Sequence, residues 1–162
     1  MGVEIERKWL IPVLPEGFDL GRGEAIDQGY LTIAPGGSET RIRSRAGKYI
    51  LTTKSGAGLV RQETSIELTR TQFEQLWPAT AGARVTKNRY QLDLTGSGVE
   101  GSQQLVIEVD VYTGTLTGLI VAEVEFPDEA SASDFTAPTW FGADVTTDGS
   151  YKNHALATGG RP

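Results

Sequence analysis

Three charged side chains stand two residues apart near the start of the chain, Glu4, Glu6 and Lys8. Because side chains of an extended strand alternate between its two faces, these three charges share one face. The other face carries Val3, Ile5, Arg7 and Trp9. A single strand of this kind is ordinarily amphipathic, with its charged row in water, so the pattern becomes informative only if it repeats.

Charged rows do return along the chain, and they are sorted by sign. The cationic rows are Arg41, Arg43 and Arg45, followed by Lys87 and Arg89. The acidic rows are Glu108 and Asp110, followed by Glu123 and Glu125. We expect a sheet with so many charged rows to close them around a polyanion and its metal ions.

The elements that position these rows are mostly short strands separated by Gly-rich and Pro-rich turns. The expected strands are residues 1–10, 25–33, 39–45, 48–54, 59–68, 84–94, 103–112 and 119–126. Helical spacing and capping residues predict helices from 69 or 71 to the proline at 78, from 128 to 135 and from 150 to 158. The fold class is therefore mainly β (α+β), and the sheet is expected to be an eight-stranded antiparallel closed β-barrel with a few peripheral helices.

Which face of each strand points inward decides whether the interior of this barrel is apolar or charged. Small soluble barrels usually have an apolar interior, which would leave the charged rows in water. Against this, the aromatic residues of the helical segments need an apolar surface to pack on, and outward-facing Val and Ile side chains would supply it. We therefore predict the inverted arrangement, a tunnel with a charged interior.

Composition limits the protein class. At 162 residues, the chain is expected to form one domain over 1–158, with a disordered tail at 159–162. The absence of cysteine excludes thiolate catalysis, Cys-zinc sites and disulfides. A net charge of −6 argues against general affinity for nucleic acid or anionic membranes. No segment reads as a signal peptide or a membrane span, so we expect a cytoplasmic protein.

These motifs, in this order, resemble the CYTH domain, also called the triphosphate tunnel metalloenzyme family, over nearly the whole chain. Glu4-Ile-Glu6-Arg-Lys8 is similar to that family's Glu-x-Glu-x-Lys signature. The other matching elements are Gln28-Gly29-Tyr30-Leu31, Arg41-Ile-Arg43, Leu51-Thr-Thr-Lys54, Arg61-Gln-Glu63, Lys87-Asn-Arg89-Tyr90, Glu108-Val-Asp110, Glu123-Val-Glu125 and Tyr151-Lys-Asn153. The closest likeness is to the short, single-domain bacterial members.

The resemblance implies a tunnel that binds a triphosphate together with Mg²⁺ or Mn²⁺. Arginine and lysine suit phosphate oxygens, whereas hard divalent cations prefer carboxylate ligands. The expected substrate-binding residues are Lys8, Arg41, Arg43, Lys54, Arg61, Lys87 and Arg89. The expected metal ligands are Glu4, Glu6, Glu108, Asp110, Glu123 and Glu125.

The implied reaction is hydrolysis of the terminal phosphoanhydride. Lys87 is a candidate to accept the proton of the attacking water, and Glu63 a candidate to orient the cations or serve a second metal. The leading interpretation is an inorganic triphosphatase with weaker action on nucleoside triphosphates. Alternatives are a class IV adenylyl cyclase, a thiamine triphosphatase and a non-catalytic polyphosphate binder. The resemblance further suggests a homodimer, with a small-molecule triphosphate as the only other partner.

Residues outside these rows are assigned to structure. Trp77 is expected to pack a helix, and His154, the only histidine, is expected at the surface. Arg45 and Glu67 share the alternation of the charged rows but fall at strand ends, where a solvated rim is expected.

Overall fold

A computed structural model describes residues 5–35, 37–55, 62–93 and 105–162 of the chain. In this part, all strands join one eight-stranded sheet. Its strands are β1 (Ile5–Leu10), β2 (Glu24–Ile33), β3 (Glu39–Arg45), β4 (Lys48–Ser55), β5 (Gln62–Leu68), β6 (Arg84–Asp93), β7 (Val106–Tyr112) and β8 (Ile120–Phe126). The predicted strands are therefore present, with small differences at their described ends. Residues 1–4, 59–61, 94 and 103–104 of the predicted strands lie outside the described residues.

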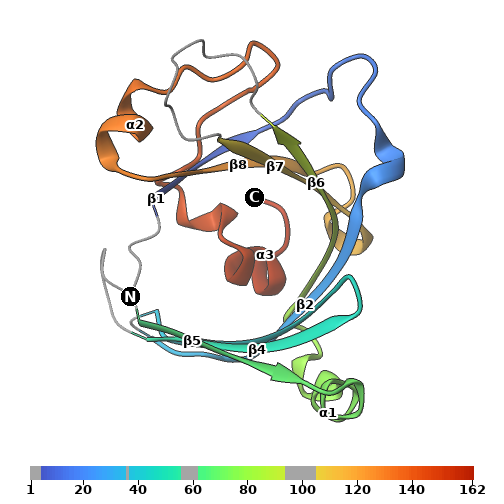
Figure 1. Cartoon of the computed structure of the whole chain (residues 1–162). Coiled ribbons are helices and arrows are strands. Elements are labelled where there is room, and N and C mark those ends of the chain that lie inside the picture. The colour runs from blue at the N-terminus through green and yellow to red at the C-terminus, as the bar shows by residue number, and fades with distance from the viewer. Residues whose placement is uncertain (1–4, 36, 56–61, 94–104) are drawn as a thin grey trace.

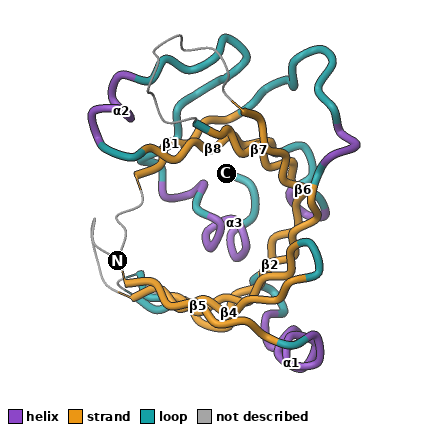
Figure 2. Tube along the Cα trace, viewed as in Figure 1, coloured by secondary structure: helices purple, strands orange, loops and turns teal. Residues whose placement is uncertain are grey.

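The sheet is strongly curved and antiparallel throughout. Its order is β1-β8-β7-β6-β2-β3-β4-β5, and every neighbouring pair is antiparallel. Figures 1 and 2 show the strands bending around a central space. In the described residues the hydrogen-bonded ladder ends at β1 and β5, which do not pair with each other. The eight-stranded antiparallel sheet is confirmed, whereas its closure into a barrel by hydrogen bonds is not.

Local sequence explains the tightest connection in the sheet. Ala46 and Gly47 join β3 to β4, directly beyond the Arg45–Lys48 pair. Both have positive φ angles, 49° and 76°, as the two central residues of a type I′ hairpin turn require. This turn fixes the register of β3 on β4, and so sets which β3 side chains share a face.

The helices are short, and they lie on both sides of the sheet. They are α1 (Arg70–Leu76), α2 (Glu129–Asp134) and α3 (Asn153–Gly159), with 3-10 turns η1 (Leu20–Arg22), η2 (Trp77–Thr80), η3 (Gly114–Leu116) and η4 (Gly149–Tyr151). The side chain of Thr69 caps α1, accepting a hydrogen bond from the Gln72 backbone N–H at 3.2 Å. None of the helices in the described ranges is long and apolar enough to cross a membrane.

Figure 1 places α1 and α2 outside the curved sheet and α3 within its concave side. There α3 packs against β2 and β6. The prediction that all helices are peripheral is therefore wrong for α3. The reason is Leu156, which is 2% exposed and fills an apolar cluster on the inner face.

Two apolar clusters lie on opposite faces of β1 and β6–β8. The outer cluster contains Trp9, Tyr90, Ile107, Val109, Ala122, Val124 and Phe126, covered by Phe135, Trp140 and Phe141. The inner cluster contains Val85, Tyr112, Leu116, Leu119, Val121 and Leu156. The outward-facing aliphatic rows confirm the inverted arrangement on these strands, and the inner cluster adds an apolar layer at one end of the interior.

The segment before η4 and α3, around residues 143–145, runs along the edge of β1 that is not paired with another strand. The Leu10 N–H donates to the Ala143 carbonyl at 2.9 Å, and the Val145 N–H donates to the Lys8 carbonyl at 2.8 Å. Arg7, on the outer face, donates to the Asp144 carboxylate at 2.7 Å. The guanidinium of Arg7 also donates to the Ala132 carbonyl at 2.9 Å, so it ties α2 to the same edge.

A glycine in β2 allows η2 to pack closely on the outer face of the sheet. A Cβ at Gly29 would stand 2.5 Å from the Cβ and Oγ1 atoms of Thr80, and Thr80 is fully buried. We predict that Gly29→Ala lowers the free energy of unfolding by about 1–3 kcal/mol, the range for overpacking a core. Urea denaturation measures this change.

Gly149→Ala is the matched control, because a Cβ there meets no atom within 4 Å. Its free energy of unfolding should stay near that of the wild type. If Gly29→Ala were equally harmless, the close packing of η2 on β2 would be incorrect.

Candidate active site

The inner faces of β6, β7 and β8 bring buried charges together. Lys87 and Asp110 are 2% and 0% exposed, and Glu123 is also buried. They alternate with the residues of the outer cluster, so they face the concave side. Tyr112, two residues after Asp110, confirms this orientation, because its hydroxyl donates to Asn153 of α3 at 2.6 Å.

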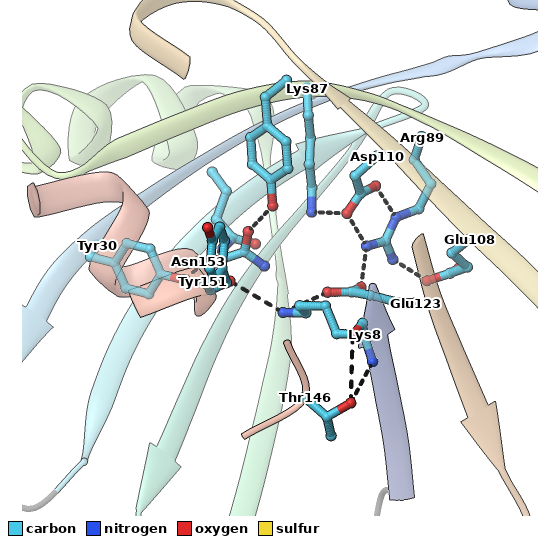
Figure 3. Close-up of polar contacts among 12 residues, drawn as sticks. Lys8, Tyr30, Lys87, Arg89, Glu108, Asp110, Glu123, Thr146, Tyr151 and Asn153 are labelled. Atoms are coloured by element: carbon cyan, nitrogen blue, oxygen red, sulfur yellow. Dashed lines mark hydrogen bonds and ion pairs between the residues drawn. The ribbon is translucent and has the colours of Figure 1, made fainter. Parts of the chain in front are cut away.

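Arg89 is the hub of this network (Figure 3). Its Nε and Nη2 atoms donate to the two carboxylate oxygens of Asp110, each at 2.7 Å. The same Nη2 donates to Glu123 at 2.9 Å, and Nη1 donates to Glu108. A planar guanidinium fork of this kind fixes the carboxylates by geometry as well as by charge.

Two lysines complete the network from either side. The ammonium of Lys87 donates to Asp110 at 2.5 Å, and that of Lys8 lies 2.9 Å from Glu123. Lys8 also donates to the Tyr151 carbonyl at 3.4 Å, in the segment that leads into α3. Buried charges thus have partners, as their desolvation requires.

The pKa values of these groups follow from burial and from the neighbouring charges. Burial alone would raise the pKa of Glu123, but Lys8, Lys87 and Arg89 lower it to about 2. Burial alone would lower the pKa of Lys8, but Glu123 outweighs it and raises the value. Burial lowers the pKa of Lys87; Asp110 opposes this, and Arg89 adds to it. The carboxylate of Glu123 therefore stays charged at neutral pH.

The facing strands β3 and β4 carry the cationic wall. Arg41 and Arg43 follow the inner alternation of β3, and Lys54 of β4 pairs with Glu63 of β5 at 2.8 Å. Lys54 lowers the pKa of Glu63 below its ordinary value, against the effect of burial. Arg45, expected at a solvated rim, lies 2.6 Å from Glu24 and is half-buried.

Positive charge on this wall is not fully compensated. The Nε atom of Arg41 is buried and has no hydrogen-bond partner. Arg43 makes no hydrogen bond in the part of the chain that the structure describes. Burial lowers the pKa of Arg43, and the positive charges of Arg41, Arg89 and Arg45 lower it further. The Arg41 Nε and the Arg43 guanidinium are thus available to an anion.

A pocket of about 390 Å³ lies at the acidic end of the interior. Its acidic lining residues are Glu6, Glu108, Glu123 and Glu125. Glu6 stands opposite Glu125 in the β1–β8 register, and Glu108 opposite Glu123 in the β7–β8 register. Like charges in directly opposed positions destabilise a sheet, so a cation here would be stabilising.

The donor set of this pocket fits Mg²⁺ or Mn²⁺ by its chemistry, because all of these ligands are carboxylate oxygens. Over the described ranges, no group of three or more acidic or histidine side chains is already arranged to hold a metal ion. Arg89 and Lys8 instead hold Glu108 and Glu123 through ion pairs. The pocket thus contains suitable metal ligands, but Glu108 and Glu123 are in ion pairs with Arg89 and Lys8.

One residue assigned to the surface lies inside. Nδ1 of His154 is 3.1 Å from the Glu39 carboxylate, on the concave side of the sheet. The surface prediction for His154 was wrong because it followed from the polar sequence around α3, and because α3 was placed outside the sheet. Glu39 itself went unnoticed, although it shares the alternation of Arg41, the signal that could have identified it.

Most of the predicted site residues do come together. Those in the Arg89 network are Lys8, Lys87, Arg89, Glu108, Asp110 and Glu123. Those on the facing strands are Arg41, Arg43, Lys54 and Glu63. Glu6 and Glu125 line the acidic pocket. Glu4 and Arg61 lie outside the described residues. Tyr112 and Asn153, whose contact joins β7 to α3, were not predicted as functional residues.

Two curated proteins and one solved structure are similar over nearly the full chain. An inorganic triphosphatase of Nitrosomonas europaea is 47% identical over 154 residues, covering 95% of this chain and 96% of that protein. An inorganic triphosphatase of Acetivibrio thermocellus is 31% identical over 159 residues, covering 96% and 94%. The crystal structure of the inorganic triphosphatase NE1496 matches with a TM-score of 0.73 and 42% identity, covering 98% of this chain and 96% of that one.

No family model matches the chain. The identity to the two relatives, sustained over nearly their whole lengths, nevertheless shows common descent. The chain belongs to the same protein family as the inorganic triphosphatases of Nitrosomonas europaea and Acetivibrio thermocellus.

Proposed function

We propose that this protein is a divalent-metal-dependent triphosphatase that cleaves the terminal phosphoanhydride of inorganic tripolyphosphate, with weaker action on nucleoside triphosphates. Its relatives bear the name inorganic triphosphatase. The structural observation that carries the proposal is the unpartnered Nε of Arg41 together with the crowded positive charge around Arg43 on the inner face of β3.

A polyanion explains this charge better than a structural role does. A buried donor without a partner costs about 1–3 kcal/mol, and the buried Nε of Arg41 is such a donor. Arg43 adds like-charge repulsion from three neighbouring arginines. An inorganic triphosphate carries several anionic oxygens over a short span, so it would satisfy both side chains at once.

The cations differ in the contact that each would make. Arg41 and Arg43 would bind phosphate oxygens through their planar forks, and Lys54 would act as a point charge. Lys8, Lys87 and Arg89 face the same space, but in the absence of substrate they hold carboxylates. The resemblance to the CYTH family adds Arg61 to the phosphate contacts, and extends the curved sheet to a closed tunnel.

Mg²⁺ or Mn²⁺ would be held by Glu6, Glu108, Glu123 and Glu125, together with Asp110 and Glu4. When bound, such an ion neutralises charge that develops on the phosphate oxygens. In this arrangement Arg89 positions the acidic side chains, because it contacts Glu108, Asp110 and Glu123 simultaneously.

The reaction itself consumes one water molecule. Its oxygen forms a bond to the terminal phosphorus, and the bond from that phosphorus to the bridging oxygen breaks. Orthophosphate and pyrophosphate are released, and the proton of the water passes to a base or to solvent. We assign the base to Lys87, whose pKa burial lowers, and the orientation of Lys54 to Glu63, which lies 2.8 Å from it.

A substrate panel tests the proposal directly. With Mg²⁺ or Mn²⁺, we expect phosphate release from tripolyphosphate to exceed release from ATP and thiamine triphosphate. Cyclic AMP formed from ATP without phosphate release would instead identify a cyclase. Tight binding of tripolyphosphate without turnover would identify a binding protein, and either result would refute the proposal.

Arg43→Gln should separate binding from stability. We predict that affinity for tripolyphosphate falls about 10- to 100-fold, as expected for one lost charged hydrogen bond. The free energy of unfolding should be unchanged or higher, because the lowered pKa of Arg43 means that folding disfavours its charged form. Calorimetric titration and urea denaturation measure the two quantities.

Arg70→Gln is the control for charge alone. This arginine lies on α1, and its side chain is 72% exposed, so both quantities should match the wild type. An Arg43→Gln protein that binds tripolyphosphate normally would remove the main support for an anion site on β3.

Glu6→Gln should abolish metal-dependent phosphate release, because it removes one carboxylate from the acidic pocket. We expect the loss at saturating substrate, with partial recovery at higher Mn²⁺ if residual ligands still bind the ion. Glu16→Gln, at an exposed position outside the sheet, controls for the change in net charge. Near-normal turnover in Glu6→Gln would disprove the metal assignment.

A further inference from the structure

Helix α3 brings the only histidine of the chain against the cationic wall. Nδ1 of His154 lies 3.1 Å from Oε2 of Glu39. The imidazole also stands edge-on to the ring of Tyr30, with 6.4 Å between ring centroids. This pair links α3 to the first residue of β3, the strand that carries the arginines.

Glu39 faces a second cation across its other oxygen. Oε1 of Glu39 is 4.0 Å from Nη1 of Arg41, which is too long for a hydrogen bond. The carboxylate is almost fully buried, with a side chain 6% exposed. A buried carboxylate requires a close cationic or hydrogen-bonding partner, and His154 supplies the nearer one.

Arg41 therefore lies near Glu39 without making a hydrogen bond to it. Its Nε is buried and has no partner, so this edge of the guanidinium is available to a phosphate oxygen. If Glu39 lost its contact with His154, Arg41 would be the closest described cation to take its place. The two arrangements compete for the same carboxylate.

We infer that His154 is a positioning residue for Arg41, and that it raises the affinity of the site for phosphate by engaging the Glu39 carboxylate. While His154 contacts Glu39, Arg41 is left to the substrate. Without that contact, Glu39 would draw Arg41 away from the phosphate. The inference rests on the proposed function, because the anion in question is its triphosphate substrate.

Other described groups near this pair are Arg41 on β3 and Tyr30 on β2. Lys54 of β4 stands opposite Glu39 in register but pairs with Glu63 at 2.8 Å. Burial raises the pKa of Tyr30 far above neutrality, so the phenol stays protonated and adds no charge.

The first test is the KM for tripolyphosphate in two variants of His154. His154→Ala removes the contact with Glu39 and should raise KM about tenfold, the loss of one charged contact. His154→Lys, which can place a cation beside Glu39, should keep KM near the wild-type value. The kcat should be the same in all three proteins.

Glu39→Gln separates positioning from a simple effect of charge. If His154 acts only through its own contact with the phosphate, His154→Ala should still raise KM when it is combined with Glu39→Gln. If His154 acts through Glu39, KM should be low in Glu39→Gln. The double variant Glu39→Gln/His154→Ala should then recover the affinity that His154→Ala loses.

Calorimetric binding of tripolyphosphate without divalent metal distinguishes failure of this inference from failure of the proposed function. A wild type that neither binds nor hydrolyses tripolyphosphate overturns the proposed function. A wild type that binds it, with KM unchanged in His154→Ala and in Glu39→Gln, overturns the role of His154 alone. Lys152→Gln, at an exposed position just before α3, serves as the charge control and should keep the wild-type KM.

Discussion

The rest of the structure depends on one constraint, the electrostatic crowding of half-buried cations on the inner face of β3. An unpaired buried donor costs about 1–3 kcal/mol, against a total stability of about 5–15 kcal/mol for a typical domain. Arg41 and Arg43 are therefore tolerated only because the surrounding sheet holds them. The same lack of hydrogen-bond partners leaves the Arg41 Nε and the Arg43 guanidinium ready to bind an anion.

The stability that supports this wall comes from the other face of the sheet. The valine and isoleucine rows of β7 and β8 face outward and pack under α2 and the aromatic residues that follow it. Inside, charged residues are grouped by function: Arg89 gathers the acidic side chains of β7 and β8, while β3 and β4 face them with positive charge. Alternation along a strand thus lets one sequence build an apolar outer layer and an ionic inner one.

Alternation also explains which features could be predicted. The two-residue spacing of Glu108 and Asp110, or of Arg41 and Arg43, assigns each pair to one face of its strand. The aromatic residues of the predicted helices need an apolar surface outside the sheet, which indicates that the charged face is the inner one. The position of α3 could not be obtained this way, because a short amphipathic helix fits either side of a curved sheet. His154 was misplaced for the same reason, since its contact with Glu39 joins residues 115 positions apart. Closure by hydrogen bonds is not confirmed in the described residues, where β1 and β5 do not pair, and short antiparallel strands suit open and closed sheets equally.

A crystal structure with tripolyphosphate bound in the absence of divalent metal would test the central claim most directly. We predict phosphate oxygens within hydrogen-bonding distance of the Arg41 Nε and of the Arg43 guanidinium, on the concave side of β3. Phosphate bound instead on the outer face, with Arg41 still unpartnered, would contradict the account.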